Sequence, residues 1–295
     1  MTYLKSLVAF TALSSSTCSA GEHFDKFLAE KGITFSQLAL QNSVQDEFKL
    51  LDEFSAKQEF RRTPSIAERD RDRDCTPYIE NQVFLKNGKP MSASFVSPAG
   101  KHRENFTHFI ASQAPFPHHV DRFWSMVVDH DIHQMVMLTE FKHANGFQLA
   151  DTYWPLEKEH PLVFGELKVT LLDEKWLFPE EVEHIQIRRF RVEGPNLDRV
   201  VTHYWYRNWI DQSVPRKKAV FSKLLEVVRE EKQESNPVLV HCAAGIGRTG
   251  VFIALYHQAE NPEMPLFQII VNLREQRPWM VGQIQQYLFC KQYNN

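Results

Sequence analysis

One ten-residue segment near the C-terminus combines a nucleophile with groups that bind phosphate. It reads H-C-A-A-G-I-G-R-T-G over residues 241–250 and follows an apolar run at 238–240 that predicts a buried strand. Small residues let successive backbone N–H groups turn toward an anion, and the helix that follows adds its own unpaired amides. Such a loop stabilises the thiolate of Cys242, whose attack on phosphorus would form a covalent intermediate. Arg248 offers a planar fork that matches two phosphate oxygens. The backbone groups expected to hold the phosphate belong to Ala243, Ala244, Gly245, Ile246, Gly247 and Arg248.

Two other interpretations of this segment compete with nucleophilic chemistry. A lone cysteine is most often an inert core residue, so Cys242 could be structural. The glycines at 245, 247 and 250 also satisfy the spacing of a dinucleotide-binding loop. The context disfavours the dinucleotide loop, because only 45 residues of the 295-residue chain follow Gly250. No second strand ending in an acidic residue follows about twenty positions later.

Helices and strands alternate along the chain around this loop. Apolar residues at helical spacing, or short helical stretches, predict helices at 43–54, 120–128, 220–228, 249–256, 266–273 and 283–289. A continuous apolar run at 135–138 predicts a second buried strand. This alternation predicts an α/β fold with helices on both faces of a sheet. The charges alternate over residues 69–74, which predicts a solvated loop.

The composition excludes several classes of protein. The chain is 43% hydrophobic and 24% charged with a net charge of -3, which is typical of a globular protein and not of a nucleic-acid-binding one. No apolar run is long enough to span a bilayer. The cysteines lack paired spacing, which predicts neither a disulfide framework nor a zinc site. They are Cys18, Cys75, Cys242 and Cys290. His130 and His133 are the closest histidine spacing, without a further cluster of ligands, so we expect no metal site.

The N-terminus leaves the location of the protein open. Lys5 precedes an apolar stretch at 7–13 and small residues up to Ala20, a pattern that resembles a secretory signal peptide over residues 1–20. The alternative is an uncleaved segment on a cytoplasmic protein. If the segment is a signal, we expect a secreted effector that acts in the reducing cytosol of another cell.

The loop at 241–250 resembles the signature of the cysteine-dependent phosphatases, H-C-x-x-G-x-x-R-[ST]-G, at every fixed position. The resemblance implies that Cys242 is the nucleophile and that Arg248 binds the phosphate. It also implies that Thr249 helps the thiolate to leave and that His241 orients the loop.

The rest of the chain from about residue 40 is similar to the tyrosine-specific branch of that family. Five segments carry the similarity: 109–115 (FIASQAP), 121–127 (DRFWSMV), 136–139 (VMLT), 153–155 (YWP) and 273–281 (LREQRPWMV). The similarity implies a single catalytic domain at 40–295 after an N-terminal extension at 21–39, with a large twisted mixed sheet and helices on both faces. It implies phosphotyrosine-containing proteins as substrates and a role in signalling. It also implies a monomer without cofactor, metal, nucleic-acid or membrane partner.

Two further segments resemble catalytic parts of that branch. Residues 209–215 (WIDQSVP) resemble its mobile W-P-D-x-G-V-P loop, which makes Asp211 the expected general acid for a phenolate with a pKa near 10. Residues 282–287 (GQIQQY) resemble Q-T-x-x-Q-Y, whose glutamines position the hydrolytic water. The resemblance nominates Gln286 and, one step from the family's first glutamine, Gln283.

Four positions depart from the branch and favour an alternative function. Asp72 aligns with a tyrosine that stacks on the substrate ring, and Leu149 aligns with a lysine that supports the acid loop. Ile210 replaces a proline and Gly282 a glutamine. The alternative is a degenerate phosphatase fold that binds phosphotyrosine ligands without turnover.

Overall fold

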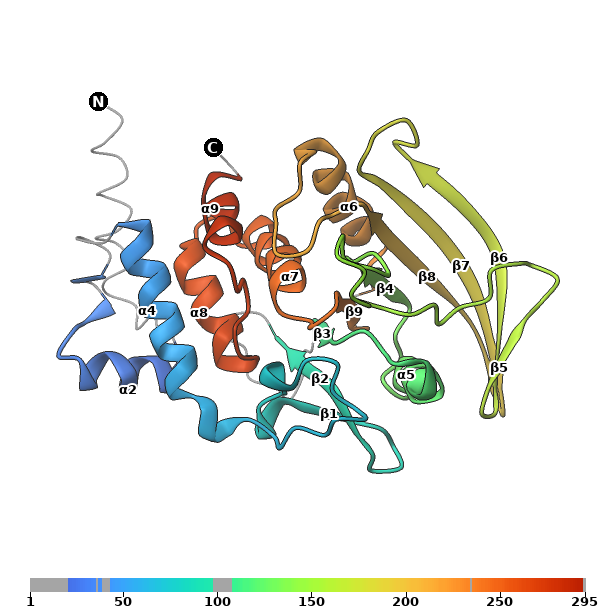
Figure 1. The fold of residues 1–295 in the computed structure, drawn as a ribbon, viewed down its shortest axis with the longest axis horizontal. Helices are drawn as coiled ribbons and strands as arrows, with labels where there is room; N and C mark the ends of the chain where they lie inside the picture. Colours follow the sequence, from blue (N-terminus) through green and yellow to red (C-terminus); the bar gives the residue numbers. More distant parts are fainter. Residues whose placement is uncertain (1–20, 36, 39–42, 98–107, 234, 294–295) are drawn as a thin grey trace.

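A nine-stranded mixed sheet runs through the residues described by the computed structural model, which are 21–35, 37–38, 43–97, 108–233 and 235–293 (Figure 1). The strand order is β1-β2-β3-β9-β4-β8-β7-β6-β5. β3, β9, β4 and β8 pair in parallel, and the outer pairs are antiparallel. The strands are β1 (Gln82–Phe84), β2 (Pro90–Val96), β3 (Phe109–Ser112), β4 (Gln134–Met137), β5 (Leu162–Phe164), β6 (Leu167–Leu177), β7 (His184–Gly194), β8 (Leu197–Arg207) and β9 (Val238–His241). The predicted sheet is confirmed.

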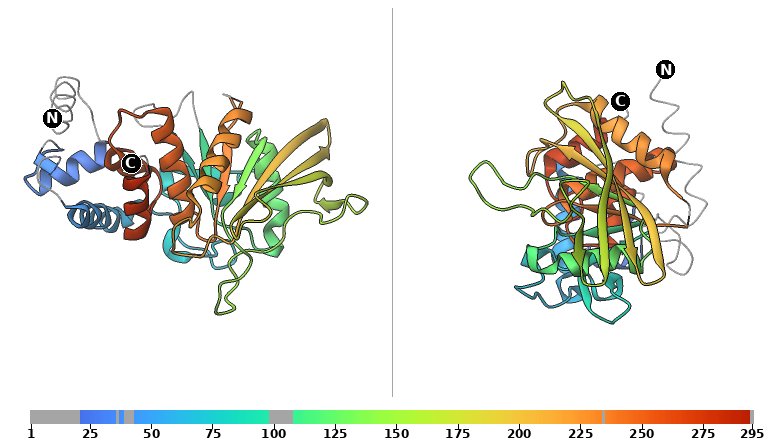
Figure 2. Two further views of the ribbon diagram at one scale, coloured as in Figure 1. Left: turned by 90° about the horizontal axis from the view of Figure 1, so that it is seen from above. Right: turned by 90° about the vertical axis from the view of Figure 1, so that its right-hand side faces the viewer.

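Helices cover both faces of this sheet. The α-helices are α2 (Glu22–Glu30), α4 (Val44–Lys57), α5 (Val120–Asp129), α6 (Lys218–Glu231), α7 (Gly247–Glu260), α8 (Leu266–Gln276) and α9 (Ile284–Gln292). Alternate residues of β9 point to opposite faces, so Val238 and Val240 join the core beneath α4 and α6–α9. Leu239 joins the second core beneath α5. The long strands β6–β8 extend away from α2 and α4, toward the other end of the molecule (Figure 2).

The six predicted helices and two predicted strands form at the expected places. Ser43 caps α4 by accepting the backbone N–H of Asp46, and Leu51 and Phe54 of that helix are fully buried. Every residue of α7 from 248 to 257 is buried. Because α7 has neighbours on all sides, its N-terminus is fixed where it meets the loop that follows β9.

The prediction of a solvated loop at 69–74 is wrong for its first three residues. Asp70 is only 2% exposed and pairs with Arg69 at 2.7 Å. The Arg71 guanidinium is also buried and pairs with Asp151 at 2.6 Å. Charges are buried at low cost only when each finds a partner. The alternating charges of this segment therefore include groups that are paired inside the protein, whereas Asp74 is exposed.

The N-terminal segment is described from Gly21 onward. Residues 1–20, with Cys18 and the expected cleavage point after Ala20, lie outside the described residues. Phe24 and Phe27 of α2 are buried and lie against Phe54 of α4, and Phe24 also contacts Phe267 of α8. The residues 21–30 therefore pack on the core that carries α8. In the described part of the chain, no helix combines the length and apolar character needed to cross a membrane.

A buried carboxyl group joins α2 to α8. Glu275 of α8 accepts the backbone N–H of Phe24 at 2.6 Å and lies 3.7 Å from Arg61. Its side chain is 11% exposed. Burial raises its pKa from 4.5 to about 7 and outweighs the opposing effects of that hydrogen bond and of Arg61.

This raised pKa predicts a pH-dependent stability. The folded protein holds the Glu275 proton more tightly than the unfolded chain, so ionisation between pH 4.5 and about 7 costs the folded state free energy, on the order of 3 kcal/mol. Glu275→Gln keeps the acceptor for Phe24 and cannot ionise. We expect the Tm of the wild type to fall relative to that of Glu275→Gln as pH rises from 5 to 8. Thermal unfolding at a series of pH values measures this, with Glu226→Gln on α6 as the exposed control. If the Tm of the wild type and that of Glu275→Gln changed in parallel with pH, the role of Glu275 in the pH dependence would be contradicted.

Candidate active site

The loop from residue 242 to 248 joins β9 to the start of α7, and two glycines give it its path. Gly245 has φ 71, and a Cβ there would lie 2.2 Å from the carbonyl oxygen of Ser112. A Cβ on Gly250 would lie 2.4 Å from the backbone nitrogen of Val281. No larger residue fits either position. The loop is therefore pressed between β3 and the segment after α8.

A buried arginine holds this loop from behind. Arg277 donates from Nε to the carbonyl oxygen of Gly245 at 2.8 Å and from Nη2 to that of Ala244 at 3.1 Å. Its third contact is with the Ser94 hydroxyl at 3.0 Å. Burial lowers its pKa to about 10, which leaves it charged at neutral pH. Because these carbonyls point at Arg277, the neighbouring amides are free to face the other side of the loop.

Cys242 is the first residue of the loop, directly after β9. Its thiol is 3% exposed and accepts the backbone N–H of Gly245 at 3.2 Å. A sulfur that receives an amide hydrogen bond is stabilised in its thiolate form. Such a sulfur can act as a nucleophile.

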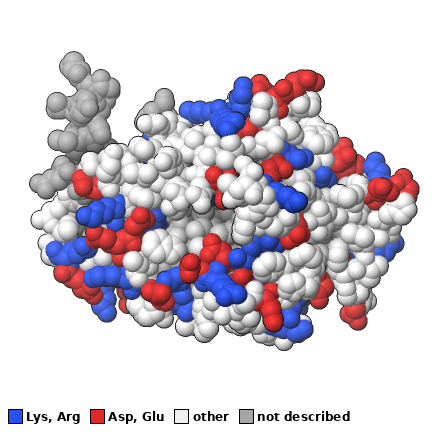
Figure 3. All heavy atoms as spheres, viewed as in Figure 1, with Lys and Arg blue, Asp and Glu red and all other residues white. Residues whose placement is uncertain are grey.

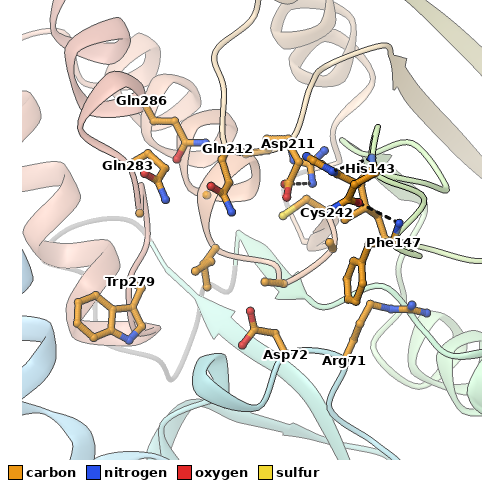
Figure 4. A pocket seen from close by; sticks show the side chains of 18 residues that line it. Arg71, Asp72, His143, Phe147, Asp211, Gln212, Cys242, Trp279, Gln283 and Gln286 are labelled. Atoms are coloured by element: carbon orange, nitrogen blue, oxygen red, sulfur yellow. Dashed lines mark hydrogen bonds and ion pairs between the residues drawn. The ribbon is translucent and has the colours of Figure 1, made fainter.

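Arg248 forms an ion pair with Asp211, and Figure 4 shows Asp211 beside Cys242. Arg248 Nη2 lies 2.5 Å from Asp211 Oδ1, and Nη1 donates to the Trp209 carbonyl at 3.3 Å. Arg248 is 2% exposed, whereas the Asp211 side chain is 24% exposed. The carboxylate thus occupies donors that an anion in the loop would also need.

The segment 209–215 is closed by hydrogen bonds of its own. The Trp209 indole is buried and donates to the Ser213 carbonyl at 3.1 Å. The Ser213 hydroxyl donates to the Ile210 carbonyl at 2.6 Å, and Gln212 adopts φ 56. The Ser213 hydroxyl therefore stabilises the turn after Ile210. Position 210 is the one at which the similar W-P-D-x-G-V-P loop has a proline, which would restrict the backbone.

Two polar side chains near the loop carry unpaired atoms. Gln286 of α9 is 1% exposed and donates from Nε2 to the Ser213 carbonyl at 3.2 Å. Within the described ranges, its Oε1 and the hydroxyl of Thr249 have no partner. A Cβ on Gly247 would lie 3.0 Å from that Oε1, so the oxygen points at the loop. Gln283 precedes α9 and lines the same cavity, partly exposed.

A buried chain of three side chains fixes His241. Tyr153 Oη lies 2.7 Å from His241 Nε2 and 2.9 Å from His203 Nε2. Burial lowers the pKa of His241 to about 4 and that of His203 well below its ordinary value, so both are neutral. The Nδ1–H of His241 donates to the Cys242 carbonyl at 3.2 Å. The Nε2 of His241 therefore accepts a hydrogen bond from the Tyr153 hydroxyl. The Nε2–H of His203 in turn donates a hydrogen bond to the Tyr153 oxygen.

Some of these groups line one cavity of about 510 Å³. Figure 3 shows this face of the molecule hollowed near its centre, with acidic and basic side chains around the hollow. The structure brings to this cavity Cys242, Arg248, Asp211, Gln283 and Gln286, together with Asp72, Leu149 and Gly282. Thr249 lies behind it in α7. Their catalytic roles stay predictions.

Sequence reasoning missed Arg277 and Tyr153 as parts of the site. Both lie in segments identified only by family similarity, and no spacing relative to Cys242 points to them. Within the described residues, no group of three or more His, Cys, Asp or Glu could hold a metal ion. His130 Nε2 instead lies 2.9 Å from the carbonyl oxygen of Phe84, and His133 lies 3.5 Å from Asp131.

Comparison with known proteins gives the same family from sequence and structure. Residues 66–294 match the family model of the protein-tyrosine phosphatases. Mouse tyrosine-protein phosphatase non-receptor type 20 is 30% identical over 253 residues, which are 83% of this chain and 57% of that protein. Human receptor-type tyrosine-protein phosphatase alpha is 30% identical over 266 residues, 84% of this chain and 32% of that protein. The chain thus spans only part of these relatives.

Solved structures of PTPN18 share the fold. PTPN18 in complex with HER2-pY1248 phosphopeptides matches with a TM-score of 0.76 and 26% identity, over 85% of this chain and 98% of that one. The catalytic domain of human protein tyrosine phosphatase non-receptor type 18 matches with a TM-score of 0.74 and 26% identity, over 92% and 98%.

The buried chain predicts the effect of removing one hydroxyl. Tyr153→Phe leaves His241 and His203 without their shared partner, which should cost about 1–3 kcal/mol. We expect the Tm in thermal unfolding to fall by several degrees. Tyr256→Phe is the matched control, because no hydrogen bond of the Tyr256 hydroxyl exists within the described residues. An equal fall in Tm for both variants would contradict the hydrogen bonds that join His203, Tyr153 and His241.

Proposed function

Because the chain belongs to the protein-tyrosine phosphatase family, we propose that it hydrolyses phosphotyrosine in proteins through a cysteinyl-phosphate intermediate. One observation carries the proposal: the Cys242 sulfur accepts an amide N–H inside a loop whose carbonyls are bonded behind it. Arg248 and Asp211, a cation and an acid, meet at the same cavity. A nucleophile, an anion site and a proton donor are the groups that a phosphate ester needs.

Substrate binding begins with an exchange of partners at Arg248. The phosphate dianion takes up the Arg248 donors that Asp211 occupies in the free protein. The backbone N–H groups of the loop bind the remaining oxygens. Asp211 is thereby released at the edge of the cavity, where its carboxylate takes up a proton from solvent and can deliver it to the ester oxygen.

In the first chemical step the Cys242 thiolate attacks phosphorus. The S–P bond forms while the bond from phosphorus to the tyrosine oxygen breaks. The departing phenolate has a pKa near 10 and takes the proton of Asp211 as it leaves. Arg248 and the loop amides stabilise the charge on the equatorial oxygens.

In the second step water attacks the phosphocysteine. Asp211, now a carboxylate, accepts the proton of the water, and the unpaired Oε1 of Gln286 accepts its second hydrogen. Gln283 supports the same water from the cavity wall. The S–P bond breaks, and the Thr249 hydroxyl donates to the departing thiolate. Inorganic phosphate leaves, and the enzyme returns to its starting state.

The substrate class follows from the family. The matching PTPN18 structures are described as complexes with HER2 phosphotyrosine peptides, which supports phosphotyrosine-containing proteins as the substrates here. We propose that the chain acts as a monomer without a cofactor, and that it binds neither nucleic acid nor membranes.

A second function is favoured by one feature of the cavity. Asp72 and Leu149 line it where the family has a tyrosine and a lysine, and Gly282 takes the place of a glutamine. A module that captures phosphotyrosine ligands without turnover would tolerate these changes. Steady-state hydrolysis of an aryl phosphate separates the two functions, because only the enzyme shows multiple turnovers.

Replacement of the nucleophile tests the mechanism. Cys242→Ser should reduce hydrolysis of a phosphotyrosine peptide to background while the peptide still binds, because the anion site is retained. Peptide turnover and peptide binding are both measured. Cys290→Ser, a buried cysteine of α9 outside the cavity, is the matched control and should keep its activity. Turnover by Cys242→Ser would overturn the mechanism.

Replacement of the acid tests Asp211. Asp211→Asn keeps an acceptor for Arg248 but cannot donate the acidic proton, so kcat should fall by about 100- to 10,000-fold. A general acid must carry its proton to act, so the kcat/KM of the wild type should decline toward alkaline pH. This alkaline decline should be absent in Asp211→Asn. A pH–rate profile with the same alkaline limb in both proteins would assign the acid to another residue.

A further inference from the structure

The cavity over Cys242 contains two side chains with a phenyl or indole ring. Of its eighteen lining residues, only Phe147 and Trp279 carry such a ring. Figure 4 shows them on opposite sides of the cavity, with Asp72 between them. Neither ring has a part in the two chemical steps. A substrate with an aromatic group must nevertheless place that group between these walls.

Phe147 presents far more uncovered apolar surface than its residue type normally does. Phe147 is 64% exposed, whereas only four of the twenty described phenylalanines are exposed and nine are buried. No ring–ring contact of Phe147 exists within the described residues. Trp279 is partly covered by its own chain. An aryl group that entered the cavity would therefore gain most by covering Phe147.

The backbone around Phe147 is held in place by hydrogen bonds. Residues 141–150 form a hairpin in which Leu149 N–H donates to the Phe141 carbonyl at 2.8 Å. His143 N–H donates to the Phe147 carbonyl at 2.8 Å, and Phe147 N–H donates to Asn145 Oδ1 at 3.0 Å. The position of Phe147 is thus set before any ligand binds, which reduces the entropy cost of binding.

The same hairpin is attached to the other wall of the cavity. Gln148 Nε2 donates to Asp151 Oδ1 at 3.2 Å, and Asp151 Oδ2 lies 2.6 Å from Arg71 Nη2. Arg71 directly precedes Asp72, whose backbone N–H donates to Gln113 at 2.8 Å. The distance between Phe147 and the wall at Asp72 is therefore constrained by an ion pair, and the cavity has a defined width.

Asp72 itself cannot supply the aromatic contact. Its Oδ1 accepts the backbone N–H of Asp74 at 3.0 Å, which holds the carboxylate in a turn. A carboxylate does not stack on a ring, and it repels an anionic ester. The apolar contact for a substrate ring must come from another side chain.

We propose that Phe147 forms the wall on which the aromatic ring of the substrate packs, and that it selects aryl over alkyl phosphate esters. This inference rests on the proposed phosphatase function and adds a specificity residue to it. Offset or edge-to-face packing between two rings adds to the apolar area that is buried. Phe147 makes no contact with the phosphate and takes no part in bond breaking.

The experiment compares esters with and without a ring. Phe147→Ala should raise KM for a phosphotyrosine peptide about 3- to 10-fold with little change in kcat, because ring packing of this kind is worth about 0.5–1.5 kcal/mol. For the matching phosphoserine peptide, KM and kcat should be the same in Phe147→Ala as in the wild type. Inhibition by vanadate, which carries no ring, should be unchanged. Phe147→Trp should restore the low KM.

Two controls decide between the inference and its competitors. Phe84→Ala removes another exposed phenylalanine, in β1 outside the cavity, and should leave every parameter unchanged. Trp279→Ala tests the opposite ring. An unchanged KM in Phe147→Ala, or a loss only in Trp279→Ala, would overturn the role of Phe147 while phosphatase activity remains. A wild-type protein that hydrolyses no ester would instead overturn the proposed function.

Discussion

The hydrogen bonds from Arg277 to the carbonyls of Ala244 and Gly245 are the constraint on which the site depends. A loop of seven residues can present its amides to an anion only if its carbonyls have partners elsewhere. A water-exposed loop would satisfy them with solvent and lose its fixed shape. A buried guanidinium satisfies two of them at once in a fixed geometry. The positive charge of Arg277, which lies on the carbonyl side of the loop, also adds to the potential that attracts an anion to the amide side.

The sheet explains why this loop meets residues from distant parts of the sequence. β9 lies between β3 and β4, so the carboxyl ends of three parallel strands come together at one edge. The hairpin at 141–150 follows β4, and the segment 209–215 follows β8, which pairs with β4. Open sheets with parallel strands bind ligands at this edge. The separate cores on the two faces hold β9 rigidly, and the loop inherits that rigidity.

The sequence predicted the parts of this protein that depend on local pattern. Apolar spacing located the helices, and the residue types of the loop at 241–250 indicated its chemistry. Contacts between distant segments were not predictable in that way. Arg277 is 35 residues from Cys242 and Tyr153 is 89, and only the similarity of their segments to the family marks them. The loop at 69–74 was misjudged for the same reason, because the partner of Arg71 is Asp151. Phe147 follows a turn, where an exposed residue gives no signal of a role.

The contact between Arg248 and Asp211 has a consequence for ligand discrimination. An internal carboxylate competes for the guanidinium at a high effective concentration, because both groups belong to one chain. A singly charged anion such as chloride or acetate only matches the charge of that carboxylate. A doubly charged oxyanion gains about twice the Coulomb energy at the same distance. The ion pair of Arg248 with Asp211 therefore favours doubly charged over singly charged anions at this site.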